Sequence, residues 1–470
     1  MLLLGARAAA HARGAAVPIP TPAPGTGAFP LHVSGRQLLD TNNAPFMLVG
    51  DSVWQIIRLP LTGVNSMDTY FANRQAKGFN AYIIEAMCGP VSNCVSNAAT
   101  GDGIVPFTGT IPGCSAGLPD CYDLTTENPT YFARLDAIIN KAASYGGVVL
   151  LDPASTDSCV AGSWMNTMIN NGATRVKNYG SFLGARYKGF PNILWMSGND
   201  FQCVGTASDV ALVVDIINAI KAAGDTHPQT AEANLLRSST WDWPSLSAPL
   251  NFNSIYTYLP TYDWVLHAYN QAAVPDYMVE ANYEHANNNN IEPAGPVSTQ
   301  VLRKQAYWSM LSGAMGQFYG NKNFMGFPAG WQNSLNDPGA VDMGFLASLF
   351  KSFDWYDLAS DQTHVVMTAG FGTYTTGALN DPITSNNYAT TGYARVATGS
   401  IAVAYIPTVR GVTFDMTKFG ANVVARWFDP TNNAFTAIGT FPNTGTHVFT
   451  PTGNNSAGDS DWVLVLQGGP

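Results

Sequence analysis

The chain has few charged residues, and basic residues in particular are scarce. Lys and Arg total 22 against 32 Asp and Glu, which gives a net charge of -10, and charged residues make up only 11% of the sequence. Nucleic acids and anionic membrane surfaces are bound by clustered Lys and Arg. The balance therefore argues against nucleic acid and membrane as partners.

Membrane spans and metal motifs are also missing from the sequence. No segment beyond the first 30 residues has the roughly 18 or more apolar residues that a membrane-spanning helix needs. There is no Cys-x-x-Cys pair, no His-Glu-x-x-His motif, no Gly-Lys-Ser/Thr phosphate loop and no dinucleotide fingerprint. We therefore predict neither a metal site nor a cofactor.

The cysteines and the opening segment bear on localisation. An even number of cysteines fits an exported, disulfide-bonded protein best, and free thiols in a cytosolic enzyme are the alternative. Residues 1–30 contain a short apolar run, an Ala-x-Ala motif and a Pro/Gly-rich end. We interpret them as a signal-peptide remnant followed by a linker, with a disordered start as the other interpretation. The six cysteines are Cys88, Cys94, Cys114, Cys121, Cys159 and Cys203.

Between residues 45 and 320, short apolar runs alternate with longer amphipathic segments. Continuous apolar runs are typical of parallel strands that are buried on both faces. A strand and a helix repeated eight times form the (β/α)8, or TIM, barrel, which is the fold that we predict. The predicted strands are residues 46–51, 81–86, 148–153, 193–200, 228–233, 254–258, 277–280 and 316–321.

From about residue 361 the pattern changes to short alternating strands separated by turn residues. This pattern is typical of an antiparallel β-sandwich. We therefore predict a signal-peptide remnant and linker at 1–30, a (β/α)8 catalytic domain at 31–360 and a β-sandwich accessory domain at 361–470.

Acidic residues end, or directly follow, five of the predicted barrel strands. The βα loops open at that rim, so it carries the active site of a (β/α)8 barrel. A single acid at a strand end more often caps a helix or pairs with an Arg, but five on one rim indicate a site. They are Asp51, Glu85, Asp152, Asp200 and Glu280.

Asp200 and Glu280 stand out because they follow the fourth and seventh strands, which lie on opposite sides of an eight-strand ring. Two facing carboxylates suit glycosidic-bond cleavage. One protonates the leaving oxygen, and the other attacks the anomeric carbon or activates water there. We expect the charge of Glu280 to hold up the pKa of Asp200.

Four stretches of the chain are distinctive: "LLDTNNAPFMLVGDSVWQI", "FPNILWMSGND", "YMVEANYE" and "GQFYGNKNFMGF". They resemble the apiosidase-like family of glycoside hydrolases, which are (β/α)8 enzymes that act on plant cell-wall glycans. The later motifs "AVAYIPT" and "DWVLVL" resemble the β-sandwich, named for collagen binding, that often follows. The resemblance implies that Asp200 is the catalytic acid and Glu280 the second carboxylate. Glu232, or a neighbour, stands where the family usually has a His.

The remaining rim residues form a predicted substrate-binding set. Aromatic rings at the rim are candidate platforms for sugar rings. We expect Glu284 to hold a loop or a helix start rather than to be the nucleophile, because Glu280 is the residue at the strand end. The set comprises Asp51, Trp54, Glu85, Asp152, Asn199, Tyr258, Tyr283, Glu284 and Tyr319.

The order of the strands also predicts how the cysteines pair. Cys159 follows the third strand and Cys203 the fourth, so they should be bonded as neighbours, which leaves Cys88–Cys94 and Cys114–Cys121 as local pairs. A Gly-x-Ser-x-Gly match at 113–117 has no strand before it and no helix after it, so we take it as a chance match.

Taken together, the residues predict a secreted or periplasmic glycoside hydrolase that cleaves plant cell-wall polysaccharides by a two-carboxylate, retaining mechanism. An endo-acting β-glucanase or cellulase-like hydrolase on the same barrel is one alternative. A non-catalytic carbohydrate-binding protein is the other. The expected partner is an oligo- or polysaccharide, and we make no prediction of the oligomeric state.

Overall fold

The computed structural model describes residues 28–91, 93–233, 237–286, 295–378, 381–396 and 399–469, with only the main chain of residue 237. The predicted signal-peptide remnant and linker at 1–30 lie almost wholly outside these residues. The described chain starts with a short hairpin of β1 (His32–Ser34) and β2 (Gln37–Leu39) and then enters the barrel.

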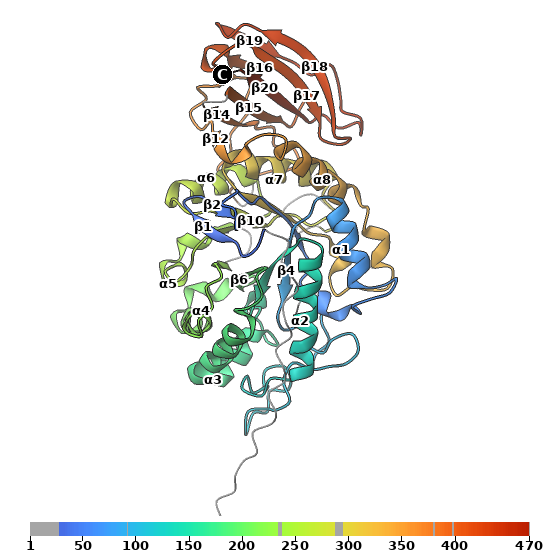
Figure 1. The fold of residues 1–470 in the computed structure, drawn as a ribbon, viewed down its shortest axis with the longest axis vertical. Coiled ribbons are helices and arrows are strands. Elements are labelled where there is room, and N and C mark those ends of the chain that lie inside the picture. Colours follow the sequence, from blue (N-terminus) through green and yellow to red (C-terminus); the bar gives the residue numbers. More distant parts are fainter. Residues whose placement is uncertain are drawn as a thin grey trace, which may run out of the picture.

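Eight parallel strands curl into the wall of the barrel, as the sequence predicts (Figure 1). Their order in the sheet is β7-β6-β5-β4-β3-β11-β10-β9, and the short β8 (Arg237–Ser239) pairs antiparallel with β9. The eight are β3 (Leu48–Ser52), β4 (Ala81–Glu85), β5 (Val148–Asp152), β6 (Ile193–Gly198), β7 (Gln229–Glu232), β9 (Asn253–Thr257), β10 (Asp276–Glu280) and β11 (Gly316–Tyr319).

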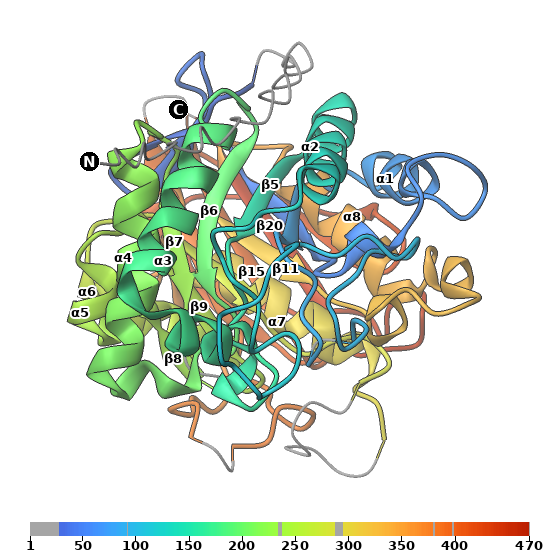
Figure 2. The same cartoon turned by 90° about the horizontal axis from the view of Figure 1, so that it is seen from below.

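Helices cover the outside of these strands, and Figure 2 shows α2, α3 and α4 outside β5, β6 and β7. All residues of β4, β5 and β6 are buried, because helices cover one face and side chains from the barrel interior cover the other. The helices are α1 (Met67–Ala76), α2 (Pro129–Ser144), α3 (Trp164–Tyr187), α4 (Ala207–Ala222), α5 (Pro244–Ser247), α6 (Thr261–Gln271), α7 (Thr299–Ser312) and α8 (Pro338–Phe350). None of the described helices combines the length and apolarity that a membrane crossing requires.

The C-terminal strands form two antiparallel sheets, which confirms the predicted β-sandwich. One sheet has the order β12-β14-β15-β20-β17-β18 and the other β13-β16-β19. The strands are β12 (Ala359–Ser360), β13 (Met367–Ala369), β14 (Thr390–Val396), β15 (Gly399–Ile406), β16 (Val412–Asp415), β17 (Val423–Asp429), β18 (Ala434–Phe441), β19 (Thr446–Phe449) and β20 (Trp462–Gly468).

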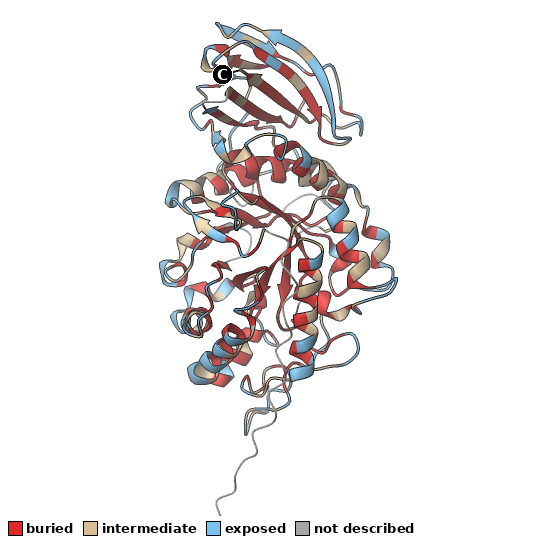
Figure 3. Ribbon diagram, in the orientation of Figure 1, coloured by how far each residue is buried: buried red, intermediate tan, exposed pale blue. Residues whose placement is uncertain are grey.

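The sandwich packs on the barrel helices α6, α7 and α8, and this contact is buried (Figures 1 and 3). Arg303 of α7 donates two 2.8 Å hydrogen bonds to Asp461 of the sandwich. Trp308 of the same helix donates a 2.9 Å hydrogen bond to the carbonyl oxygen of Tyr388. Arg303 also pairs with Asp342 of α8 at 2.8 Å, so this buried guanidinium links the sandwich to two barrel helices. Because removing a partner from a buried ion pair is costly, we expect the contact to stabilise both domains.

Candidate active site

The loop after β6 places Asp200 at the C-terminal rim of the barrel. Gly198, Asn199 and Asp200 have φ values of 116°, 77° and 47°, so the chain turns sharply where the strand ends. A Cβ at Gly198 would lie 2.3 Å from the carbonyl oxygen of Glu232 on β7, so only glycine fits there. Strained turns of this kind gather at functional sites.

The neighbouring loop after β5 holds this turn in place. The backbone amide of Ser158 donates a 3.0 Å hydrogen bond to the carbonyl oxygen of Asp200, and its hydroxyl donates a longer one of 3.5 Å to the Asp200 carboxylate. Asn199 donates a 2.9 Å hydrogen bond to the hydroxyl of Ser155. The Cys159–Cys203 disulfide joins the same two loops.

Glu280, the last residue of β10, is held by three tyrosine hydroxyls. Tyr256 and Tyr258 donate hydrogen bonds of 3.0 and 2.5 Å to its Oε1, and Tyr283 donates one of 2.6 Å to its Oε2. The indole of Trp54 donates a 2.9 Å hydrogen bond to the Tyr283 hydroxyl. The register between β9 and β10 shifts just before Glu280, which brings it opposite Tyr256. Such bulges re-aim side chains next to active sites.

Burial dominates the electrostatics of both carboxyl groups. It raises the pKa of Asp200, while the nearby hydroxyls of Tyr256 and Ser158 lower it. Burial, followed by the charge of Asp200, raises the pKa of Glu280 to about 7. We expected the charge of Glu280 to hold up the pKa of Asp200, and burial is the largest cause of that shift. Two neighbouring acids with raised pKa values can hold one proton between them near neutral pH.

A third acid, Glu232, lies at the end of β7 and was not among the predicted site residues. It is fully buried, and among the described residues neither of its carboxylate oxygens has a hydrogen-bonding partner of ordinary geometry. Burial raises its pKa well above the usual value, and the charges of Glu280, Asp200 and Asp152 add to this, while the backbone of Asp200 offsets part of it. Its surroundings therefore favour the neutral form of Glu232 next to the two candidate catalytic acids.

Asp51 and Glu284, both in the predicted substrate-binding set, have partners that give them structural roles. Asp51 is fully buried and forms a 2.5 Å ion pair with Arg74 of α1. Glu284 accepts a 3.0 Å hydrogen bond from the amide of Gly339 at the start of α8 and one of 2.5 Å from the hydroxyl of Tyr319. Glu284 thus holds a helix start, which is the role that we expected in preference to that of nucleophile.

Glu85 and Asp152 are fully buried as well. Glu85 accepts a 2.7 Å hydrogen bond from the amide of Gly89 and so orders the loop after β4. Asp152 accepts a 3.1 Å hydrogen bond from the amide of Ala154, and no described residue is a partner of its other oxygen. Burial, with the charge of Glu85, raises the pKa of Asp152 well above its usual value. Of these two acids, Asp152 is the one whose charge helps to raise the pKa of Glu232.

The cysteines form the three predicted disulfides, Cys88–Cys94, Cys114–Cys121 and Cys159–Cys203. Among the described residues, Glu85 lies with Cys88 and Cys94 in the one group with the spacing of metal ligands. A metal binds the thiolate form of cysteine, and both of these sulfurs are bonded to each other. This group is therefore no metal site.

Tyr256 is the other site residue that sequence reasoning missed. A signal for it was present, because alternate residues of a strand point to the same face, and Tyr256 lies two residues before Tyr258. The signal for Glu232 was weaker. It stood out only as a departure from the His of the resembling family.

Comparisons with known proteins agree with this geometry. A family model described as "Apiosidase-like, catalytic domain" matches residues 32–357, and one described as "Putative collagen-binding domain of a collagenase" matches residues 380–467. No curated protein matches the chain.

Two solved structures resemble the whole chain. One is titled "Glycoside hydrolase"; it has a TM-score of 0.74 and 21% identity, and the match covers 94% of this chain and 97% of that one. The other is a glycoside hydrolase family 5 protein from Bacteroides vulgatus, also with a TM-score of 0.74 and 21% identity, and with 93% of each chain covered. At this identity the likeness shows the fold of both domains. The family model spans most of the chain and includes both candidate acids, and the chain therefore belongs to the apiosidase-like family of glycoside hydrolases.

Proposed function

We propose that the protein is an exported, retaining glycoside hydrolase of plant cell-wall polysaccharides, with Asp200 as general acid/base and Glu280 as nucleophile. The observation that carries the proposal is the hydroxyl of Tyr256. It donates to Glu280 and lies close enough to Asp200 to lower the pKa of that residue too. Two hydrogen-bond lengths through this hydroxyl place the carboxylate oxygens of Glu280 and Asp200 within about 6 Å of each other. A separation of this order supports a retaining enzyme, in which the carboxyl groups lie about 5–5.5 Å apart, over most inverting ones.

The reaction that follows has two steps. Asp200 donates its proton to the glycosidic oxygen while the Glu280 carboxylate attacks the anomeric carbon, so the aglycone leaves and a glycosyl ester of Glu280 forms. Asp200, now ionised, takes a proton from water, and this water attacks the same carbon and releases Glu280. Three phenol donors orient Glu280 before the substrate arrives, which supports this assignment of the nucleophile.

Export and the substrate class belong to the same proposal. Three disulfides support an oxidising compartment, because cytosolic thiols are kept reduced. Membership of the apiosidase-like family supports a plant cell-wall glycan, and apiosides in pectin side chains are the first candidates.

Release of reducing sugar from a panel of plant polysaccharides tests the proposal, with wild type compared with Asp200→Ala. We expect release by wild type and its loss in the variant, and proton NMR of the first product should show the anomeric configuration of the substrate. The thermal midpoint of each variant controls for folding. Binding of a polysaccharide without any release would support the carbohydrate-binding alternative, and an inverted first product would contradict the role of Glu280.

A further inference from the structure

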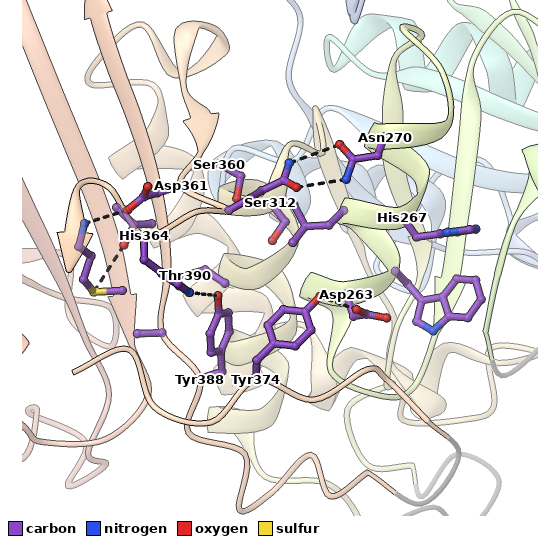
Figure 4. Close-up of a pocket in the computed structure, with 16 residues that line it drawn as sticks. Asp263, His267, Asn270, Ser312, Ser360, Asp361, His364, Tyr374, Tyr388 and Thr390 are labelled. Carbon is purple, nitrogen blue, oxygen red and sulfur yellow. Dashed lines mark hydrogen bonds between the residues drawn. The ribbon is translucent and has the colours of Figure 1, made fainter. Parts of the chain in front are cut away.

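A hollow of about 560 Å³ lies outside the active site, where α6 of the barrel meets the sandwich (Figure 4). Asp263, Trp264 and His267 of α6 line one side, and Tyr374 and Tyr388 from the sandwich side line the other. Small-molecule sites commonly have volumes of about 300–1,000 Å³ and form preferentially where domains meet. In both size and position, this junction hollow fits a binding site.

Polar atoms without partners lie in its walls. The hydroxyls of Ser312 and Thr390 and Nδ1 of His364 belong to residues that line the hollow, are themselves covered, and have no hydrogen-bonding partner among the described residues. Ser312 and Thr390 are 0% and 4% exposed. Because these three atoms are covered, they make the wall of the hollow polar but do not themselves reach a guest in it.

Other side chains fix the shape of the hollow across the two domains. Asn270 of α6 and Gln362 exchange amide hydrogen bonds of 3.1 and 3.5 Å, which form part of the wall (Figure 4). Tyr374 donates a hydrogen bond to Asp263, and its ring meets that of Tyr388 edge-on at 5.0 Å. Tyr374 remains 43% exposed, so an apolar surface stays open to a ligand beside these polar groups.

The charges of the lining select the class of ligand. Within the part of the chain that the structure describes, the lining contains two carboxylates, Asp263 and Asp361, and no Lys or Arg. Uronic acids and other anions would meet these carboxylates without a cation to balance them. A neutral sugar instead offers hydroxyl groups for hydrogen bonds and an apolar ring face for an aromatic side chain.

We propose that the junction hollow is a second binding site for a neutral oligosaccharide, separate from the catalytic acids. Barrel helices run opposite to the strands, so the first turn of α6, with Asp263, lies at the rim that carries Glu280. A glycan held there would keep a polymeric substrate close to the rim. That consequence rests on the proposed function, whereas binding itself does not.

Calorimetric titration tests the site with full-length Glu280→Gln protein, which holds substrate without turning it over. The probes are cellotetraose, xylotetraose and mannotetraose, with tetragalacturonate as the anionic probe. We expect at least one neutral probe to bind, with affinity reduced about three- to tenfold by Tyr374→Ala and also reduced by Gln362→Ala, whose exposed side chain is not needed for folding. Phe435→Ala removes an aromatic side chain of similar exposure, 40%, elsewhere on the sandwich and should leave binding unchanged.

The other outcomes of the titration would contradict the proposed second binding site. Binding of none of the neutral probes would overturn it, as would binding that both variants leave unchanged or tighter binding of tetragalacturonate. These failures differ from failure of the proposed function. A protein that binds through Tyr374 but releases no sugar would keep the second site and lose the hydrolase, and the reverse pattern would keep only the hydrolase.

Discussion

Tyr256 on β9 and Glu280 on β10 face each other across neighbouring strands, joined by a 3.0 Å hydrogen bond from the phenol to Oε1. Tyr258 donates to the same oxygen, so Glu280 is fixed from one side by two phenols of a single strand. Hydrogen bonds that favour the charged carboxylate oppose the effect of burial on its pKa. The site thus keeps a buried acid ionisable near neutral pH.

The first prediction compares two buried glutamates that lie four residues apart. Glu280→Gln should lower kcat by roughly 10⁴-fold or more, because an amide of nearly the same size cannot attack the anomeric carbon. Glu284→Gln should lower kcat far less and mainly lower the thermal midpoint, because Glu284 holds the start of α8. Steady-state kinetics and thermal melts check both. Equal losses of kcat in the two variants would show that the nucleophile is misassigned.

The second prediction is that Asp200→Ala changes the kinetics in a way that differs from the loss of the nucleophile. Loss of general acid catalysis should cost about 10²–10⁴-fold on natural glycans and much less on aryl glycosides, whose leaving groups need little protonation. Added azide should restore part of the turnover by replacing water as the nucleophile in the second step. The azide product is measured by NMR. Equal losses on both kinds of substrate, with no effect of azide, would argue against Asp200 as acid/base.

The tyrosines should set the acid limb of the pH profile. With the pKa of Glu280 at about 7, kcat/KM should fall as the pH drops below that value, since the nucleophile becomes protonated. The phenols lower this pKa, so Tyr258→Phe should move the acid limb to higher pH, and Tyr256→Phe should move it in the same direction. Profiles of kcat/KM from pH 4 to 9 test this. An acid limb that stays in place in both variants would contradict the assignment.

The loop that carries Asp200 should depend on its own disulfide more than on a distant one. Removal of Cys159–Cys203 by a double Ser substitution frees the loops after β5 and β6 and should lower both kcat and stability, the latter by about 2–4 kcal/mol. Removal of Cys114–Cys121 is the matched control and should affect stability more than kcat. Denaturant unfolding and kinetics of both variants decide the point, and a larger kcat loss in the control would refute it.

The fold was predictable from the sequence because its signals are local. Seven continuous apolar runs mark strands that are buried on both faces, a weaker segment at 228–233 completes the eight, and acids at five strand ends mark the rim. The short β8, β12 and β19 were missed, since strands of two to four residues carry little periodicity. The ion pair of Asp51 with Arg74 was also missed, because α1 brings Arg74 from 23 positions along the chain.

The same limit applies to the site. The two acids could be named from their places at strand ends, but their partners depend on the packing of side chains inside the barrel. Sequence spacing gave no sign that Asp200 is buried enough for burial to dominate its pKa. Nor did it show that neither oxygen of Glu232 has a partner of ordinary geometry among the described residues, since that depends on which groups surround it in space.

Glu232 yields the last prediction, which concerns stability against pH. Its pKa in the folded protein is raised well above the usual 4.5, so the folded state keeps a proton that the unfolded state loses. Its contribution to stability is therefore full below about pH 4.5 and is lost as the pH rises through the folded pKa. While Glu232 stays protonated, the free energy of unfolding falls by about 1.4 kcal/mol per pH unit on its account.

Glu232→Gln should remove this slope, because an amide does not titrate. The variant should gain stability relative to wild type between pH 5 and pH 8, as measured by urea unfolding at both values. Asp152, Asp200, Glu280 and the phenol of Tyr277 face the same group and remain in both proteins, so the difference isolates Glu232. Glu284→Gln is the comparison. Burial raises the pKa of that carboxyl too, but the hydrogen bonds from Tyr319 and Gly339 oppose the shift, so its loss should cost stability at both pH values. If the difference between wild type and Glu232→Gln were the same at pH 5 and pH 8, Glu232 would not be the neutral acid that its surroundings require.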